Sequence, residues 1–165
     1  MSIEIKELVI RMVVSAWESY YQRTNKLFEK LSDEQLQKQV APGRNTGTYL
    51  LGHLTAVTDG MLPLLGFGDR LYPQLDKIFL ESPDGAELEM PSVTELREYW
   101  KTVNEKLAEG IKSVKPDDWF TRHNAVSQED FLKEPHRNKL NIIVNRTNHQ
   151  SWHYGQLLFL QPSVE

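Results

Sequence analysis

Hydrophobic residues recur at intervals of three and four positions along most of this chain, which is the spacing that amphipathic helices produce. The first such stretch runs from Ile3 to about Leu31, with charged side chains between the apolar ones. A second stretch starts after Asn45 or Thr46, either of which can cap a helix. Gly60 and Pro63 interrupt its far end, so we expect a kink or an end there. The first part of the chain therefore predicts two long helices.

A long connection separates the second stretch from the third. Residues 66–91 contain several glycines and prolines, with room for one short helix near residues 74–79. Ser92 and Glu95 then match a capping box, in which each side chain bonds to a backbone N–H of the other residue. A third amphipathic helix follows and ends before Pro116. We interpret residues 66–91 as a crossover connection.

The last third of the chain predicts one more long helix. Residues 115–135 have the character of an irregular loop, with a short hairpin near residues 123–127. A fourth apolar stretch runs from about His136 to Leu160, and Pro162 ends it. Four long helices with one long connection between the second and the third predict an all-α fold, a four-helix bundle of the crossover type. We expect residues 1–165 to form a single domain.

Composition and charge narrow the range of functions. The net charge of −4 argues against binding to nucleic acid, because proteins that do so usually present a basic surface to the phosphates. The chain has no cysteine, so a metal site would have to use histidine, aspartate or glutamate. The first residues lack the pattern of a secretion signal, and nowhere are about eighteen apolar residues consecutive. We therefore expect a cytoplasmic protein without a membrane anchor.

Three histidines lie in apolar stretches of two predicted helices. His149 and His153 are four residues apart, so in a helix they project from one face, one turn apart. His53 lies among the leucines of the second predicted helix, where an imidazole without a partner would be costly to bury. Neutral imidazoles are common metal ligands, and three of them leave a coordination position open for water or substrate. We therefore predict that His53, His149 and His153 hold a divalent metal ion.

Other interpretations of the histidines remain open. Two histidines at this spacing also arise by chance, and a lone histidine on a helix face is usually a hydrogen-bonded structural residue. The protein would then be a non-catalytic bundle that binds a small ligand or a protein partner. A zinc protease is disfavoured, because Gln150 stands where the H-E-x-x-H pattern has its glutamate base. Asp59 is a poor candidate for a base, since it lies on a different helix face from His53.

Several other side chains are candidates for the surroundings of this site. Asn145 and Gln156 lie on the predicted inner side of the fourth helix, where each would orient an imidazole or else be a capped or solvated amide. His123 and His136 lie in or beside loops, and we interpret both as surface residues. The candidates for pocket walls, which would otherwise belong to the core, are Trp17, Tyr20, Thr24 and Trp152.

The sequence resembles the DinB-like superfamily of metal-dependent enzymes, a group that includes the YfiT-like proteins. The resemblance rests on the predicted helices and crossover, and on two motifs, Gly52-His53-Leu54 and His149-x-x-x-His153-x-Gly155-Gln156-Leu157. It implies a bundle in up-down-down-up order. It also implies a divalent metal ion, zinc or nickel in many members, held by the histidines of these two motifs.

The resemblance also implies a class of activity. Some members use the metal to activate a low-molecular-weight thiol for transfer or isomerisation, and others look hydrolytic. The implied function is therefore a metal-dependent transferase or hydrolase for a small-molecule substrate, and a homodimer is the implied assembly. For an anionic thiol cofactor the sequence offers no clear basic pocket, and the arginines that we consider are Arg44, Arg70 and Arg146.

Overall fold

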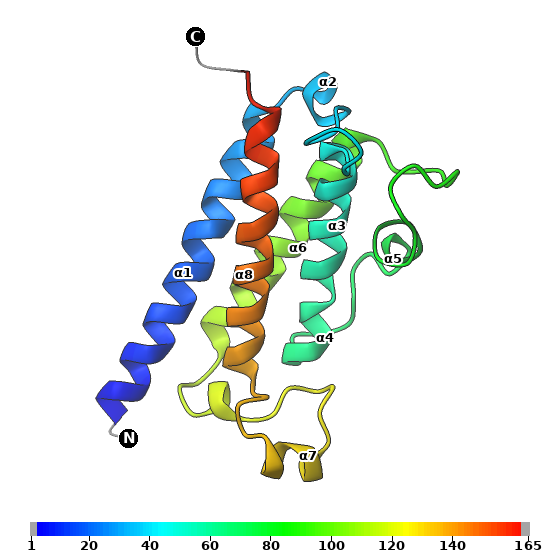
Figure 1. Ribbon diagram of the computed structural model, residues 1–165. Helices are drawn as coiled ribbons and strands as arrows, with labels where there is room; N and C mark the ends of the chain where they lie inside the picture. Colours follow the sequence, from blue (N-terminus) through cyan, green and yellow to red (C-terminus); the bar gives the residue numbers. More distant parts are fainter. Residues whose placement is uncertain (1–2, 163–165) are drawn as a thin grey trace.

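The computed structural model describes residues 3–162, and within them every regular element is a helix. Figure 1 shows that α1 and α8 lie side by side and rise in this view, whereas α3 and α6 descend beside them. The all-α class predicted from the sequence is therefore confirmed. The four long helices are α1 (Ile3–Lys30), α3 (Gly47–Asp59), α6 (Val93–Ser113) and α8 (Lys139–Leu157).

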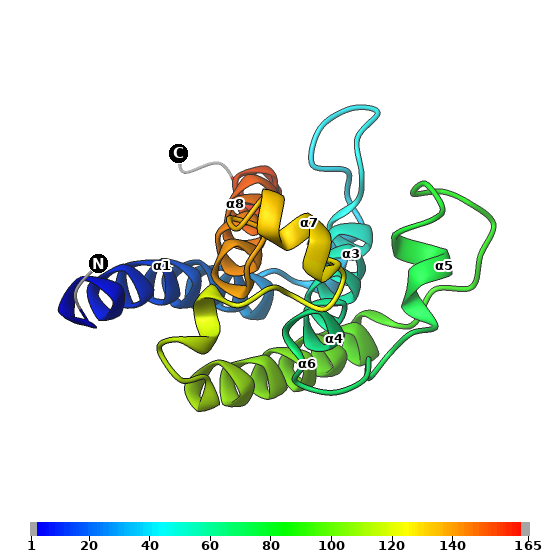
Figure 2. The same ribbon diagram turned by 90° about the horizontal axis from the view of Figure 1, so that it is seen from below.

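Shorter helices occupy the ends and the connections of the bundle. The crossover between α3 and α6 contains α5, which Figure 2 shows on the outer side of α3, away from α1 and α8. The short helices are α2 (Asp33–Leu36), α4 (Met61–Leu65), α5 (Leu75–Phe79) and α7 (Gln128–Lys133), with the 3-10 helices η1 (Asp118–Phe120) and η2 (Leu158–Leu160).

The predicted capping residues begin two of the long helices. The hydroxyl of Thr46 accepts a hydrogen bond from the N–H of Tyr49 at 3.1 Å, which caps α3. Ser92 and Glu95 form the predicted capping box at the start of α6. At the far end of α3, Gly60 separates this helix from α4, so the interruption expected near this glycine is present.

The connection between α6 and α8 differs from the predicted one. The hairpin expected near residues 123–127 does not form, because Ser127 caps the short helix α7 and so starts a helical turn. The fourth long helix begins at Lys139 and not near His136. The side chain of Asn138 caps this helix, and a capping residue marks the start of a helix more strongly than the first residue of the apolar pattern does.

A buried carboxylate holds the start of the crossover against α3. Asp59 is fully buried and accepts hydrogen bonds from the N–H groups of Leu71 and Tyr72 at 2.8 and 3.0 Å. Arg70 also contacts it, with Nε 3.3 Å from a carboxylate oxygen. These bonds satisfy the buried charge and fix the chain as it turns towards α5.

The packing of α5 on α3 depends on a glycine next to His53. A Cβ atom added to Gly52 would lie 2.3 Å from the ring of Phe79, so only a residue without a side chain leaves room for this ring. Phe79 is fully buried. The glycine therefore allows α5 to lie close to the middle of α3.

Buried side chains form two clusters along the bundle. One cluster gathers around α3, α5 and the ends of α1 and α8, and the other gathers around α4, the lower parts of α1 and α6, and the start of α8. On α8 the histidines lie between Ile143 of one cluster and Leu157 of the other. Among the described residues, no helix has the combined length and apolar character needed to cross a membrane.

Candidate metal centre

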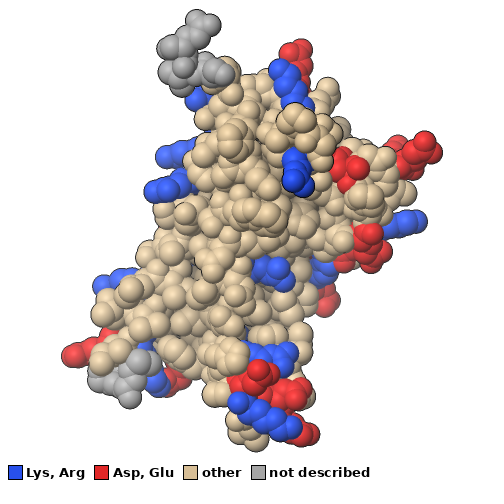
Figure 3. Space-filling view, in the orientation of Figure 1, with Lys and Arg blue, Asp and Glu red and all other residues tan. Residues whose placement is uncertain are grey.

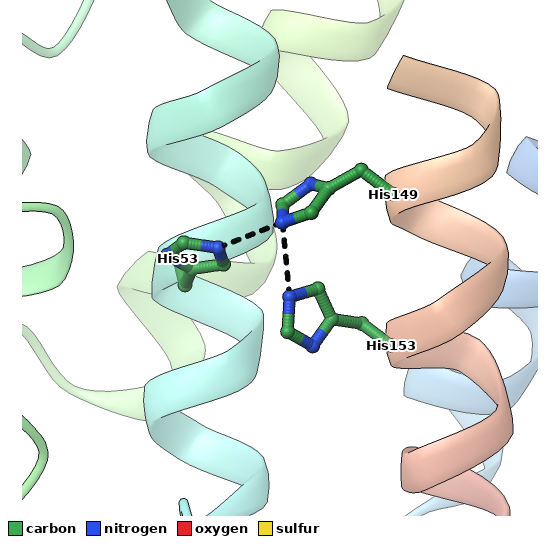
Figure 4. Close-up of side chains that lie close together, drawn as sticks. All are labelled: His53, His149 and His153. Carbon is green, nitrogen blue, oxygen red and sulfur yellow. Dashed lines mark hydrogen bonds between the residues drawn. The ribbon is translucent and has the colours of Figure 1, made fainter. Parts of the chain in front are cut away.

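Three imidazole rings from two helices meet between α3 and α8, as Figure 4 shows. His53 lies in the middle of α3, and His149 and His153 lie one turn apart on α8. The Nε2 atoms of His53 and His149 are 3.2 Å apart, and those of His153 and His149 are 3.0 Å apart. Each ring offers one ligand nitrogen, and these atoms all lie within 4.8 Å of one another. The structure thus brings together the histidines that the sequence singled out.

Hydrogen bonds to oxygen orient two of the three rings. Nδ1 of His53 lies 2.8 Å from the backbone carbonyl oxygen of Phe79 on α5. Nδ1 of His153 lies 2.8 Å from the side-chain oxygen Oε1 of Gln156. A carbonyl oxygen can only accept, so each Nδ1 carries the proton and donates it. In both neutral rings the Nε2 lone pair is therefore free and points at the common centre.

The third ring has no such partner. Nδ1 of His149 is buried and makes no hydrogen bond within the part of the chain that the structure describes. If the proton of His149 is on Nε2, this one proton faces two acceptors, the Nε2 atoms of His53 and His153. If the proton is on Nδ1, the Nε2 lone pairs of all three rings face one another. Either state leaves a buried polar group unsatisfied, which typically costs about 1–3 kcal/mol. A cation between the rings would use all three lone pairs.

The spacing of the nitrogens fits a transition-metal ion. Nitrogen ligands lie about 2.0–2.1 Å from zinc, so at bond angles between octahedral and tetrahedral they are about 2.9–3.4 Å apart. Two of the three separations, 3.0 and 3.2 Å, fall within this interval, and the third is at most 4.8 Å. Hydrogen bonds from Nδ1 to oxygen are also the usual support for a metal-binding histidine. The residues present therefore fit a divalent ion with open coordination positions.

Burial keeps the imidazoles of His149 and His153 neutral. Burial, together with the nearby charges of His153, His53 and Arg146, lowers the pKa of His149 to about 4. Burial also lowers the pKa of His153, opposed by the hydrogen bond to Gln156 and assisted by His53. The neutral form is the one that binds metal, so near neutral pH protons do not compete with a metal for His149 and His153.

The two amides that were candidates for orienting an imidazole differ in position. Gln156 contacts His153 as described above. Asn145 is exposed, and the Nδ1 atom of His149 one turn later remains without a partner among residues 3–162. Asn145 therefore does not have the predicted role, because its position at the edge of the helix stripe directs the amide to solvent.

Gln150 and Thr24 connect α8 to α1 and do not face the histidines' common centre. Nε2 of Gln150 donates a hydrogen bond to the hydroxyl of Thr24 at 3.0 Å, and this hydroxyl donates to the carbonyl of Tyr20 at 2.8 Å. Both side chains are buried. The residue in the place of a protease glutamate is thus used in helix packing, and Thr24 is a packing residue and not a pocket wall.

The predicted aromatic walls also separate. Trp17 is buried in the core and stacks on Tyr21, with ring centroids 5.8 Å apart. Tyr20 packs edge-on against Tyr154 at 6.3 Å, on the surface shared by α1 and α8. Trp152, which we expected to point inward, is 64% exposed. It precedes a ligand by one residue, and a rotation of about 100° turns it away from the ligand face.

A cavity of about 440 Å³ lies beside His153, between the end of α8 and the loop that precedes α3. Trp152 lines it, so this aromatic is a wall of an open cavity even though it does not point inward. Among the loop residues, the sequence suggests only Arg44, as a candidate for an anionic thiol, because a loop position carries no periodic signal. The lining residues are Val40, Gly43, Arg44, Asn45, Trp152, His153 and Gln156.

Arg70 and Asp59, two other charged candidates, have partners in the crossover. Arg70 pairs with Asp59 and Asp76 and donates to the carbonyl of Ala56, so it is used to hold the crossover. Asp59 is fully engaged, as described above, and does not act as a base. Of the other histidines, His136 is exposed, as predicted.

His123 departs from its predicted surface position. It is partly covered, and its Nδ1 atom is buried without a partner among the described residues. Burial and the charge of Arg137 lower its pKa. It does not belong to the group of side chains in residues 3–162 that could hold a metal ion.

The carbonyl of Phe79 is the site component that sequence reasoning missed. It is a backbone atom, so the type of side chain at position 79 does not identify it. The available signal was Gly52 beside His53, since a glycine inside a helix often marks the close approach of another segment.

Comparison with known proteins assigns the family. No curated protein matches the chain. The sequence model of the DinB superfamily matches residues 16–157, which include His53, His149 and His153 and all of α3, α6 and α8. The match covers most of the chain and agrees with its all-helical fold. The chain therefore belongs to the DinB superfamily.

Proposed function

We propose that this protein is a metal-dependent enzyme in which His53, His149 and His153 hold a divalent ion. Zinc or nickel is the proposed metal. The observation that carries the proposal is the orientation of the rings: two oxygen acceptors, on Phe79 and Gln156, direct the Nε2 lone pairs of their histidines at the Nε2 atom of the third. Such an arrangement is unfavourable by itself and favourable around a cation.

The geometry supports a catalytic more than a structural centre. Three protein ligands leave at least one position for water or substrate, and His53 and His149 are only partly buried. When bound, the ion would lower the pKa of a water or thiol at this position. The chain's own residues hold the ligand rings, and Trp152 and Arg44 form walls beside them.

A thiol or water is the proposed nucleophile, so the reaction is a thiol transfer or a hydrolysis. Within the described residues, no carboxylate is among the charged groups that shift the pKa values of His149 and His153. This supports a nucleophile that loses its proton on binding, without a neighbouring carboxylate as base. For a thiol transfer, the family resemblance makes a low-molecular-weight thiol the proposed co-substrate.

Metal content tests the centre itself. Protein purified without an affinity tag or chelator should contain roughly one zinc or nickel ion per chain. His153→Ala should reduce this content to background, and His136→Ala, which changes an exposed histidine outside the cluster, should leave it unchanged. Metal-free wild-type protein that does not take up added zinc or nickel would contradict the proposal.

An activity screen separates the enzyme from the alternative, a non-catalytic bundle that binds a small ligand or a protein. Metal-loaded protein is assayed for thiol transfer to an electrophile and for ester and amide hydrolysis. The control is the variant in which all three histidines are alanine. Rates that depend on the histidines support the enzyme, and equal rates in both proteins support the binding module.

Location and assembly stay predictions from the sequence and the family resemblance. A cytoplasmic location is expected, and a homodimer is expected in solution. Light scattering coupled to gel filtration measures the assembly directly, because a dimer has twice the mass of the chain.

A further inference from the structure

Arg146 is a partly buried cation one turn before His149 on α8. The two residues are three positions apart, which places them on the same side of the helix. Burial lowers the pKa of Arg146, and its positive charge contributes to the lowered pKa of His149. The guanidinium is therefore both partly removed from water and close to the candidate metal ligands.

Within the described part of the chain, this guanidinium has no hydrogen-bond or ion-pair partner. Other arginines with substantial cover do have carboxylate partners. Arg70, with a side chain 20% exposed, pairs with Asp59 and Asp76. Arg97, with a side chain 28% exposed, pairs with Asp33. A cation that is covered and unpaired costs free energy, so its presence on α8 calls for a partner from outside the chain.

The charged side chains near the three histidines are mainly positive. The charged groups that shift the pKa values of His149 and His153 are histidines and Arg146. In Figure 3, Lys or Arg atoms lie near the middle of the face, over α8, and the nearest Asp or Glu atoms lie to their right, towards α3 and α5. Arg44 lines the cavity on the His153 side. Three neutral imidazoles would leave both charges of a divalent ion uncompensated, so the site favours a negatively charged ligand.

We infer that Arg146 binds an anionic group of the substrate, a carboxylate or a group of similar shape and charge, while another atom of the same molecule occupies the open position at the histidines. The inference rests on the proposed metal centre. A guanidinium offers parallel N–H donors that match a carboxylate, and partial removal from water strengthens this contact. Arg146 thereby selects small acids over neutral molecules of the same size.

The test compares two thiols of nearly equal size, 3-mercaptopropionate and 3-mercaptopropionamide, on cobalt-loaded protein. Thiolate binding to cobalt produces an absorption band, from which each Kd is obtained by titration. The wild type should bind the acid more tightly than the amide. Arg146→Met should reduce this preference by about tenfold or more, because a charge-assisted hydrogen bond is lost. The difference in acidity between the two thiols is the same for every protein, so it cancels when the preference of the variant is compared with that of the wild type.

Two further variants sharpen the comparison. Arg146→Lys keeps the charge and loses the paired donors, so it should retain part of the preference. Arg137→Met removes an arginine that lies before α8 and pairs with Glu134. This variant should prefer the acid over the amide as strongly as the wild type does. In urea denaturation of the metal-free proteins, Arg146→Met should be at least as stable as the wild type, because it removes an unpaired, partly buried charge.

The outcomes separate the inference from the proposed function. Wild-type protein that does not bind cobalt overturns the metal centre, and the inference with it. Cobalt binding with an unchanged preference in Arg146→Met overturns only the inference. Loss of cobalt binding or of folding stability in Arg146→Met would assign this residue a structural role and would also overturn the inference.

Discussion

Two oxygen acceptors decide what the three histidines can do. The carbonyl of Phe79 and the amide of Gln156 each hold a proton on Nδ1 of one ring, at 2.8 Å in both cases. Without these contacts either ring could exchange tautomers and turn its protonated nitrogen to the centre. The orientation of the ligands is therefore a property of their neighbours as much as of the histidines.

Removing the amide acceptor should weaken metal binding. In Gln156→Leu, His153 loses the hydrogen bond that fixes its tautomer, and zinc affinity should fall by about 10- to 100-fold. Competition with a chromophoric chelator measures the affinity. Gln22→Leu, which changes an exposed glutamine on α1, is the control and should bind zinc as the wild type does. Equal affinity in both variants would show that Gln156 does not support the ligand.

The lowered pKa of His149 predicts how the stability of the metal-free protein depends on pH. The folded pKa is about 4 and the ordinary value is 6.5, so the unfolded chain takes up this proton first as the pH falls. The free energy of unfolding should therefore be fully retained above pH 6.5 and should decrease as the pH falls towards about 4.

Urea denaturation at about pH 7.5 and about pH 5 checks this dependence. His149→Gln keeps a polar side chain but cannot take up a proton, so its stability should change less between the two conditions. An identical pH dependence in the variant and the wild type would contradict the assignment of this effect to His149.

At the scale of elements, α5 connects the crossover to the site. Phe79, the last residue of α5, supplies the carbonyl that orients His53. The ring of Phe79 packs where Gly52 has no side chain. Hydrophobic periodicity predicts the long helices, because each buries an apolar stripe. It does not predict which connection lies over α3, because this contact depends on the path of the crossover and on one glycine.

Gly52→Ala should disturb both stability and metal binding. The added Cβ would lie 2.3 Å from the Phe79 ring, so α5 must shift, at a cost of about 1–3 kcal/mol. The shift also moves the carbonyl that orients His53, so zinc affinity should decrease. Thermal or urea denaturation and chelator competition provide the two measurements.

Gly155→Ala is the matched control on α8. An added Cβ there meets nothing within 4 Å, so the helix should gain about 0.5–1 kcal/mol from the loss of glycine flexibility. A destabilised Gly155→Ala together with a stable Gly52→Ala would contradict the described packing of α5 on α3.

At the scale of the whole molecule, the site joins segments that are far apart in the chain. His53 and His149 are 96 residues apart and meet because α3 and α8 pack against one another. The sequence predicted the three candidate ligands, which the structure brings together, since they lie in apolar helical stretches and match the family motifs. It could not distinguish Gln156, which contacts a ligand, from Asn145, which is exposed, because both lie at helical spacing from the histidines.

The central claim is that three imidazoles bind one divalent ion. X-ray absorption at the zinc edge of the zinc-loaded protein tests it most directly, since the fine structure reports ligand type and distance. We expect three imidazole nitrogens at about 2.0–2.1 Å and at least one further light atom from water, and His53→Ala should reduce the imidazole count by one. A zinc environment with at most one imidazole, or a spectrum unchanged in His53→Ala, would contradict the account.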